Sequence, residues 1–142
     1  MNSSITFEYS LLPGLERTGV LVPMLPITLM NGIYSFPTIA LVDSGAQRGL
    51  ISTVIADGLN IKWRDFPKRE GFSTGGNFLY HEVGETKTEI CNTSFLFNLN
   101  VVEGIYAFKC ILGRSDIFRV AKITFEGYKK QFHIDLNAGG LN

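Results

Sequence analysis

The sequence lacks the features that several broad functional classes need. Lysine plus arginine and aspartate plus glutamate balance at 13 each, so neither a basic surface for nucleic acid nor an acidic tail is expected. No apolar run reaches the roughly 18 residues of a membrane-spanning helix. The first residues, Met1 to Ser4, lack the basic and then apolar layout of a signal peptide. We therefore expect a cytoplasmic protein, or a domain cut from a longer polypeptide, with no nucleic-acid or membrane partner.

Signals for metals, cofactors and disulfides are equally sparse. The two cysteines, Cys91 and Cys110, have no CxxC or histidine neighbour, which argues against a zinc site. Isolated cysteines are more often buried thiols, although the sequence leaves a disulfide open. Gly75 and Gly76 lack the lysine of a P-loop. The sequence therefore predicts no metal and no cofactor.

Length and periodicity favour one domain made mostly of strands. The 142 residues, 45% of them apolar, are enough for one core and too few for two ordinary domains. A helix is expected over residues 52–58, with Ser52 as its cap and Gly58 as its stop. Asn31-Gly32 predicts a hairpin turn. Period-two patterns and turn signals predict strands at residues 5–9, 20–29, 36–42, 95–101 and 132–136.

The most informative residues are Asp43-Ser44-Gly45-Ala46, directly behind the apolar run 39–42. A buried carboxylate is costly unless it is paired or hydrogen-bonded. Ser44 offers a hydroxyl, Gly45 allows close backbone approach, and Ala46 keeps the turn narrow. The pattern predicts a carboxylate held at the end of a strand among N–H and O–H donors. Taken alone, Asp-Ser-Gly is more often an ordinary turn.

A second pattern lies near the C-terminus, where Ile111-Leu112-Gly113-Arg114 precedes a segment that could begin a helix with Ser115 as its N-cap. Together the two patterns resemble the retropepsin-like aspartic proteases, in particular the single-domain cellular and prokaryotic members. The likeness spans about residues 22–136 of one domain, 1–142. It implies an all-β fold: a closed β-barrel of the acid-protease type with one or two short helices and a flap hairpin.

The chain departs from the viral pattern of this family at two positions. Ser44 replaces the commoner threonine but keeps the hydroxyl. Gln47 stands where many viral members carry an acid that pairs with the arginine after the Ile-Leu-Gly triplet, so Arg114 lacks that partner. These differences leave room for a domain that binds without cleaving.

The resemblance implies roles for named residues. Catalysis would fall to Asp43, Ser44 and Gly45, with Ser44 hydrogen-bonding to a partner's backbone. The hairpin at residues 71–78 would be a flap over the substrate. An extended peptide would bind as an added strand. The residues expected to bind it are Ala46, Gln47, Thr74, Gly75 and Gly76.

The family's chemistry needs two carboxyl groups that share a proton. The ionised group activates a water, and the protonated group donates to the scissile carbonyl. Only Asp43 begins an Asp-Ser/Thr-Gly triplet, so the second group must come from another copy. We therefore expect a twofold homodimer, with the strands at 5–9 and 132–136 as candidates for an intermolecular sheet.

Three interpretations remain open on the sequence alone. The leading one is an aspartic endopeptidase that is active as a homodimer. The second is an inactive retropepsin-fold domain that dimerises or binds peptides. The third is an unrelated small β-barrel that binds a small ligand, with Asp43 in a plain turn. His81 and His133 lack a Ser or Cys partner and are interpreted as structural or exposed.

Overall fold

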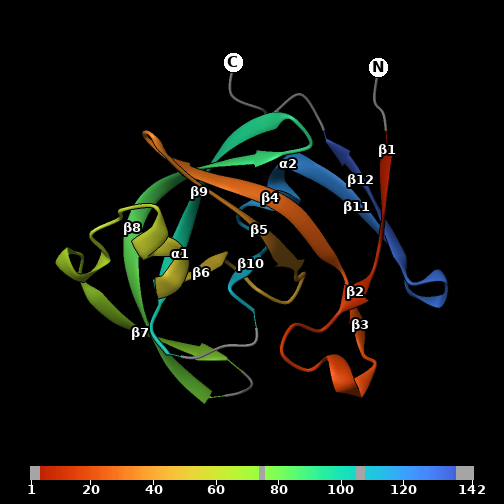
Figure 1. The fold of residues 1–142 in the computed structure, drawn as a ribbon, viewed down its shortest axis with the longest axis horizontal. Helices are drawn as coiled ribbons and strands as arrows, with labels where there is room; N and C mark the ends of the chain where they lie inside the picture. The colour runs from red at the N-terminus through yellow and green to blue at the C-terminus, as the bar shows by residue number, and fades with distance from the viewer. Residues whose placement is uncertain (1–3, 74–75, 105–107, 137–142) are drawn as a thin grey trace.

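The computed structural model describes residues 4–73, 76–104 and 108–136, and strands dominate it (Figure 1). One sheet has seven strands in the order β4-β5-β10-β6-β9-β8-β7. A further pairing of β4 with β8 closes its first six strands into a ring. The strands of this sheet are β4 (Met24–Asn31), β5 (Tyr34–Val42), β6 (Leu50–Ser52), β7 (Lys68–Ser73), β8 (Gly76–Ile90), β9 (Thr93–Val102) and β10 (Cys110–Leu112).

The remaining elements are short. A second sheet has the order β1-β12-β11, and β2 pairs with β3. These strands are β1 (Ser4–Glu8), β2 (Ser10–Leu11), β3 (Leu21–Val22), β11 (Ala121–Glu126) and β12 (Gln131–Leu136). The helices are α1 (Thr53–Gly58) and α2 (Ile117–Val120), with single 3-10 turns η1 (Glu16–Thr18), η2 (Trp63–Asp65) and η3 (Gly127–Lys129). The predicted all-β class is confirmed.

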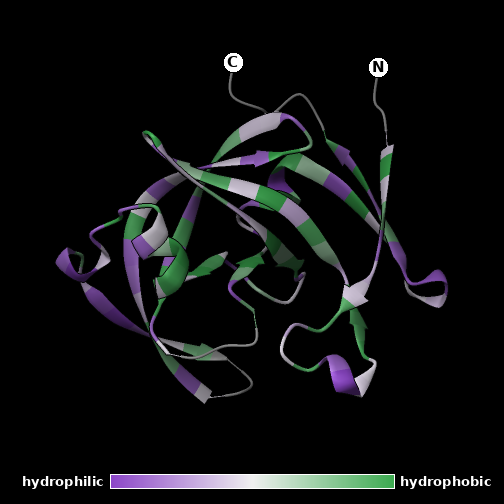
Figure 2. Ribbon diagram, viewed as in Figure 1, coloured by the Kyte–Doolittle hydropathy of each residue, from purple (hydrophilic) through white to green (hydrophobic). Residues whose placement is uncertain are grey.

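The closed ring forms because alternate residues of its strands are apolar and face inward. Leu25, Ile27 and Leu29 of β4 are buried, and so are Phe95 and Phe97 of β9. Successive side chains of a strand point to opposite faces, so this period places one apolar row inside the ring. The alternation is visible as changing colour along the ribbon of β4 (Figure 2). Full burial of such a side chain stabilises the fold by about 1.5–3 kcal/mol.

Local signals of the sequence are borne out in the first half of the chain. Gly32 adopts a positive φ of 60° in the β4–β5 turn, where a glycine is least strained. The Ser52 side chain caps α1 by accepting from the Ile55 N–H over 3.3 Å. The strand expected over 20–29 is divided at Pro23, whose carbonyl accepts from the Val42 N–H over 3.0 Å.

The N-cap of α2 differs from the expectation. Asp116 caps the helix by accepting from the Ile117 N–H over 2.8 Å. The Ser115 hydroxyl instead donates to the Gln47 carbonyl, which belongs to the turn after β5. The prediction of Ser115 was wrong because a distant carbonyl competes for its hydroxyl.

The two terminal strands pair with each other inside one chain. The antiparallel register of β1 and β12 runs from Ser4 opposite Asp135 to Glu8 opposite Gln131. Because β12 also pairs with β11 along its length, both of its edges are occupied. Of the two segments expected to join an intermolecular sheet, β12 therefore has no open edge, whereas β1 has a strand partner on one side only among the described residues; the intermolecular sheet itself stays a prediction.

The model also bears on the cysteines and on membrane insertion. Cys91 and Cys110 are free thiols, so the disulfide left open by the sequence is not formed. Burial raises the pKa of the Cys110 thiol. Among the described residues, no helix has the length and apolar character to cross a bilayer. Nor do those residues gather three or more His, Cys, Asp or Glu side chains in a metal-binding arrangement.

Candidate active site

The two sequence patterns meet at the end of a pair of parallel strands. Leu41 and Val42 of β5 lie opposite Ile111 and Leu112 of β10. The Asp43 N–H continues this pairing by donating to the Leu112 carbonyl over 2.9 Å. The Asp-Ser-Gly-Ala turn and the glycine after Ile-Leu therefore leave the sheet side by side.

The turn itself holds the Asp43 carboxyl group. Its Oδ1 atom accepts from the Gly45 N–H over 2.9 Å, and the Asp43 carbonyl accepts from the Ala46 N–H over 3.2 Å. Asp43 is half-buried, whereas Ser44 and Gly45 are exposed. Within the described residues, neither Oδ2 nor the Ser44 hydroxyl has a hydrogen-bonding partner. The cradle of donors expected from sequence is thus only partly formed by one chain.

The segment after β10 fastens the other end of the turn. The Arg114 N–H donates to the Ala46 carbonyl over 2.9 Å, and the Ser115 N–H donates to the Gln47 carbonyl over 2.8 Å. A Cβ on Gly113 would lie 2.5 Å from the Ala46 carbonyl oxygen. Only glycine fits at this position without moving the backbone.

Asp116 is a site residue that the sequence reasoning missed. Its side chain is buried, with Oδ2 accepting from the Gly49 N–H over 2.7 Å. Its Oδ1 accepts from the N–H groups of Gly113 (2.7 Å) and Ile117 (2.8 Å). One carboxyl group thus joins the chain after the Asp43 turn, at Gly49, and the end of β10, at Gly113, to the start of α2. A signal was available in the sequence, because an aspartate directly before the apolar Ile117-Phe118 is a candidate N-cap.

Two opposing effects act on the ionisation of Asp116. Burial raises its pKa, because the charged form is poorly solvated in the interior. The three N–H donors and the nearby Arg48 act in the opposite direction but do not cancel the effect of burial. Asp116 is therefore a structural carboxyl group at the back of the turn.

The hairpin predicted as a flap is formed by β7 and β8. Its register runs from Lys68 opposite His81 to Ser73 opposite Gly76. Thr74 and Gly75, two of the predicted peptide-binding residues, lie outside the described residues. Gly76 has a positive φ of 117° at the start of β8. Phe72 is 77% exposed beside this tip.

The base of the hairpin is anchored by His81, which is buried as expected for a structural residue. Its Nδ1 lies 2.9 Å from the Phe66 carbonyl oxygen, and its Nε2 lies 2.7 Å from Glu103 Oε2. The hydrogen bond from His81 holds the pKa of Glu103 below its usual range. The Trp63 ring contacts the imidazole edge to face, with centroids 5.1 Å apart.

A charged group connects the hairpin to the Asp43 turn. Glu82 Oε1 lies 3.4 Å from Arg69 Nε of β7 and 4.0 Å from Arg48 Nη1, which follows the turn. We name this group, Arg48, Arg69 and Glu82, the charged wall. No local pattern in the sequence indicates the charged wall, because its three residues come from separate segments.

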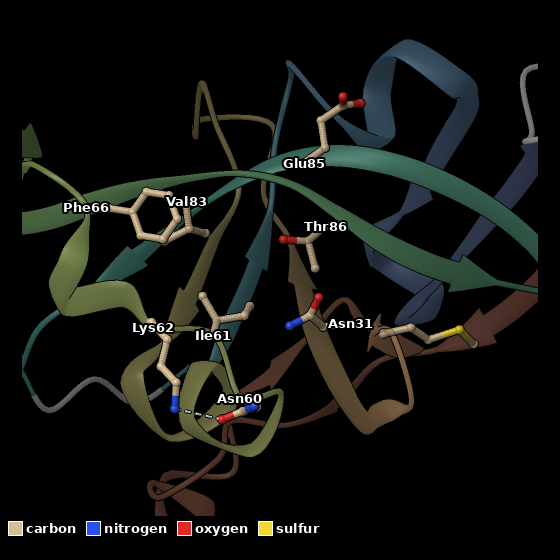
Figure 3. Close-up of a pocket in the computed structure, with 9 residues that line it drawn as sticks. Asn31, Asn60, Ile61, Lys62, Phe66, Val83, Glu85 and Thr86 are labelled. Carbon is tan, nitrogen blue, oxygen red and sulfur yellow. Dashed lines mark hydrogen bonds between the residues drawn. The ribbon is translucent and has the colours of Figure 1, made fainter.

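A cavity of about 260 Å³ lies elsewhere, between the β4–β5 hairpin, β8 and the segment after α1 (Figure 3). Asn31 and Asn60 at this cavity bond within the chain, to the Leu59 carbonyl (2.9 Å) and Lys62 (2.9 Å). The predicted site residues 43–47 do not line it. The residues around it are Met30, Asn31, Asn60, Ile61, Lys62, Phe66, Val83, Glu85 and Thr86.

Three solved structures, of proteases or protease-like domains, have a fold similar to this chain. A retropepsin-like aspartic protease from Rickettsia conorii superposes with a TM-score of 0.65 at 13% identity, covering 96% of this chain and 93% of that one. The retroviral protease-like domain of Ddi1 from Leishmania major gives 0.57 at 22% identity, covering 72% and 81%. The EIAV protease, bound to an inhibitor, gives 0.52 at 18%, covering 69% and 86%.

Sequence comparison adds nothing to this likeness. No family model matches the chain, and no curated protein matches it in sequence. The chain has the retropepsin-like fold, as its residues predicted. Identities this low establish the fold, so activity has to be argued from the site.

Proposed function

We propose that this protein is an aspartic endopeptidase that is active as a homodimer. The observation that carries the proposal is the placement of Asp43. In a retropepsin-like fold, its carboxyl group stands at the end of β5 with Oδ1 fixed by the Gly45 N–H at 2.9 Å. The turn that carries it is fastened to the segment after Gly113.

The proposed reaction uses one Asp43 from each copy. Two carboxyl groups within a few ångströms cannot both ionise readily, so the pair holds one proton. The ionised member accepts a proton from a water that attacks the scissile carbonyl, and the protonated member donates to that carbonyl oxygen. No covalent intermediate with the protein forms. Ser44 is proposed to hydrogen-bond to the partner's backbone, which its exposed hydroxyl supports.

The contacts of the other carboxyl groups support the need for a second copy. Asp116 is buried behind the turn and already accepts from three N–H groups. Asp57 accepts from Trp63 Nε1 over 2.8 Å. Neither is placed to face Asp43 as the second member of a catalytic pair.

The proposed substrate is an extended peptide between the turn and the β7–β8 hairpin. Ala46 and Gln47 would contact the peptide from the side of the Asp43 turn, and Thr74, Gly75 and Gly76 would contact it from the hairpin tip. The carbonyls of Ala46 and Gln47 already accept from Arg114 and Ser115. The exposed Gln47 side chain is therefore the part of this residue left to bind peptide.

Cleavage of a peptide library between pH 4 and 7 tests the activity, with Asp43→Asn as the matched variant. Asparagine keeps the size of the side chain and an oxygen for the Gly45 N–H, so the turn is expected to persist. We expect cleavage by the wild type and none by the variant. Equal cleavage by both would remove Asp43 from the mechanism, and cleavage by neither would favour the peptide-binding alternative.

A mixing experiment tests the shared site. At constant total protein, replacing wild type with Asp43→Asn protein and allowing subunit exchange should make activity fall as the square of the wild-type fraction, because only wild-type pairs carry two carboxyl groups. A linear fall would show that each chain acts alone. Sedimentation of the mixture checks that the variant still dimerises.

A further inference from the structure

The charged wall beside the Asp43 turn is held in place from the core side. Arg48 directly precedes Gly49, whose N–H donates to Asp116 (2.7 Å) and whose carbonyl accepts from the Asn100 N–H (3.0 Å). The backbone at Arg48 is therefore fixed, while the Arg48 side chain remains 44% exposed. A fixed backbone with an exposed side chain suits a group that meets a ligand.

The register of the strands brings the hairpin to the same place. Glu82 lies opposite Asn100, the residue that bonds to Gly49. Arg69 lies opposite Tyr80, two residues before Glu82 and so on the same face of the hairpin. The charged wall therefore joins the hairpin proposed to cover the substrate to the chain directly after the Asp43 turn.

The charges of this wall do not balance. A single exposed carboxylate, Glu82, is shared by two guanidinium groups, at 3.4 Å and a loose 4.0 Å. The Asp116 carboxyl group, which also attracts Arg48, is buried and already accepts from three N–H groups. Arg114 adds a third cation beside the turn, because its N–H bonds to the Ala46 carbonyl and its side chain forms no ion pair with any described residue. Each guanidinium carries five N–H donors, so many donors remain available to an anion.

We propose that Arg48 and Arg69 form a subsite for an acidic side chain of the peptide substrate. The inference rests on the proposed function. An aspartate or glutamate of the peptide displaces Glu82 from Arg48 and forms a two-point contact with its guanidinium. Because the dimer is twofold, the wall occurs on both sides of the scissile bond, so the preferred peptide carries acids on both sides.

A purely structural wall gives a different result. If Glu82 only holds the hairpin against the turn, reversing the charge of Arg48 loosens the hairpin and lowers the affinity for all peptides alike. If Arg48 binds an acidic side chain of the substrate, the same change reverses which peptide binds more tightly. The preference between two peptides therefore separates the roles even where overall affinity falls.

The test is peptide binding to the Asp43→Asn protein, measured by fluorescence anisotropy. Two labelled peptides share an apolar centre and differ only in carrying Glu or Lys at the second position on each side. We expect the Glu peptide to bind about tenfold more tightly, with the difference shrinking at high salt. Adding Arg48→Glu should reverse the preference. Adding Lys87→Glu, the same charge change at an exposed position farther along β8, should leave it intact.

The inference is overturned if the two peptides bind equally, if neither binds, or if Arg48→Glu leaves the preference unchanged. Its failure is distinct from that of the proposed function. Cleavage of both peptides by the wild type at equal rates would support the proposed protease activity and contradict the proposed acidic subsite. Charge-dependent binding without any cleavage by the wild type would support the acidic subsite and contradict the proposed protease activity.

Discussion

Replacing Asp116 with asparagine tests the role of the buried carboxyl group behind the Asp43 turn. In the wild type its two oxygens accept from the N–H groups of Gly49, Gly113 and Ile117 at 2.7–2.8 Å. Asparagine has one carbonyl oxygen, so its NH₂ group must face at least one of these donors. In the better orientation the oxygen keeps Gly113 and Ile117, and the Gly49 N–H is left buried without an acceptor.

The size of the effect follows from these contacts. A hydrogen bond to a charged group contributes about 1.5–3 kcal/mol, and a buried donor left alone costs about 1–3 kcal/mol. The neutral side chain recovers part of this, because burial disfavours the charged form of Asp116 and raises its pKa. We therefore expect Asp116→Asn to lower the free energy of unfolding by about 2 kcal/mol. Asp116→Ala leaves all three N–H donors buried without an acceptor, so it should lower the free energy of unfolding by about 3–5 kcal/mol.

Urea unfolding followed by the fluorescence of the single tryptophan, Trp63, measures this loss. The ring of Trp63 is buried against His81, so unfolding exposes it. Asp65→Asn, the same substitution at an exposed position, should change stability by less than about 0.5 kcal/mol. If Asp116→Asn is as mild as this control, the carboxyl group does not hold the turn.

The same variant should also change how stability depends on pH. Because the folded pKa of Asp116 lies above the ordinary 3.8, the folded state binds more protons than the unfolded state between those two values. The contribution of Asp116 to the free energy of unfolding is therefore fully present below pH 3.8, and it is lost as the pH rises through the folded pKa. The difference in unfolding free energy between the wild type and Asp116→Asn should follow that curve. A constant difference would contradict the argument.

Two further substitutions test other contacts. The hydrogen bond from His133 is the main cause that lowers the pKa of Glu126 to about 2 from 4.5. The stability from Glu126 should therefore be present above pH 4.5 and lost as the pH falls towards 2. Calorimetry should show a flatter Tm curve for Glu126→Gln over this range, and parallel curves would contradict this. Gly113→Ala places a Cβ 2.5 Å from the Ala46 carbonyl oxygen, so it should cost about 1–3 kcal/mol and abolish peptide cleavage. Unchanged kcat/KM would show that the turn tolerates the shift.

The parts of this fold that were predictable are those fixed by neighbouring residues. The period of two at 95–101 shows which face of β9 is buried, and Ser52 marks the start of α1 through a bond to Ile55, three residues away. The meeting of Asp43 with Gly113 was reached through the family resemblance. Nothing in local periodicity places two segments that lie so far apart beside each other.

What escaped prediction depends on partners that are distant in the sequence. Ser115 has the composition of an N-cap, but its hydroxyl bonds to the Gln47 carbonyl, 68 residues away. Asp116 then takes the capping role while also reaching Gly49, 67 residues away. The ion pairs of Glu82 depend on the register of β8 with β7 and β9. Each case was decided by tertiary contacts that override local preference.

The pairing of the terminal strands limits how two copies can share a site. Since β11 and β1 cover both edges of β12, β12 contributes to a dimer only through its side chains. Strand addition between copies is open at the outer edges of β1 and β11, which have no strand partner in the described part of the chain. The turn offers a further contact, because the Ser44 hydroxyl is exposed there. In a dimer of this chain we therefore expect contacts between the Asp43 turns, with any pairing of strands between copies at β1 or β11 and none at the edges of β12.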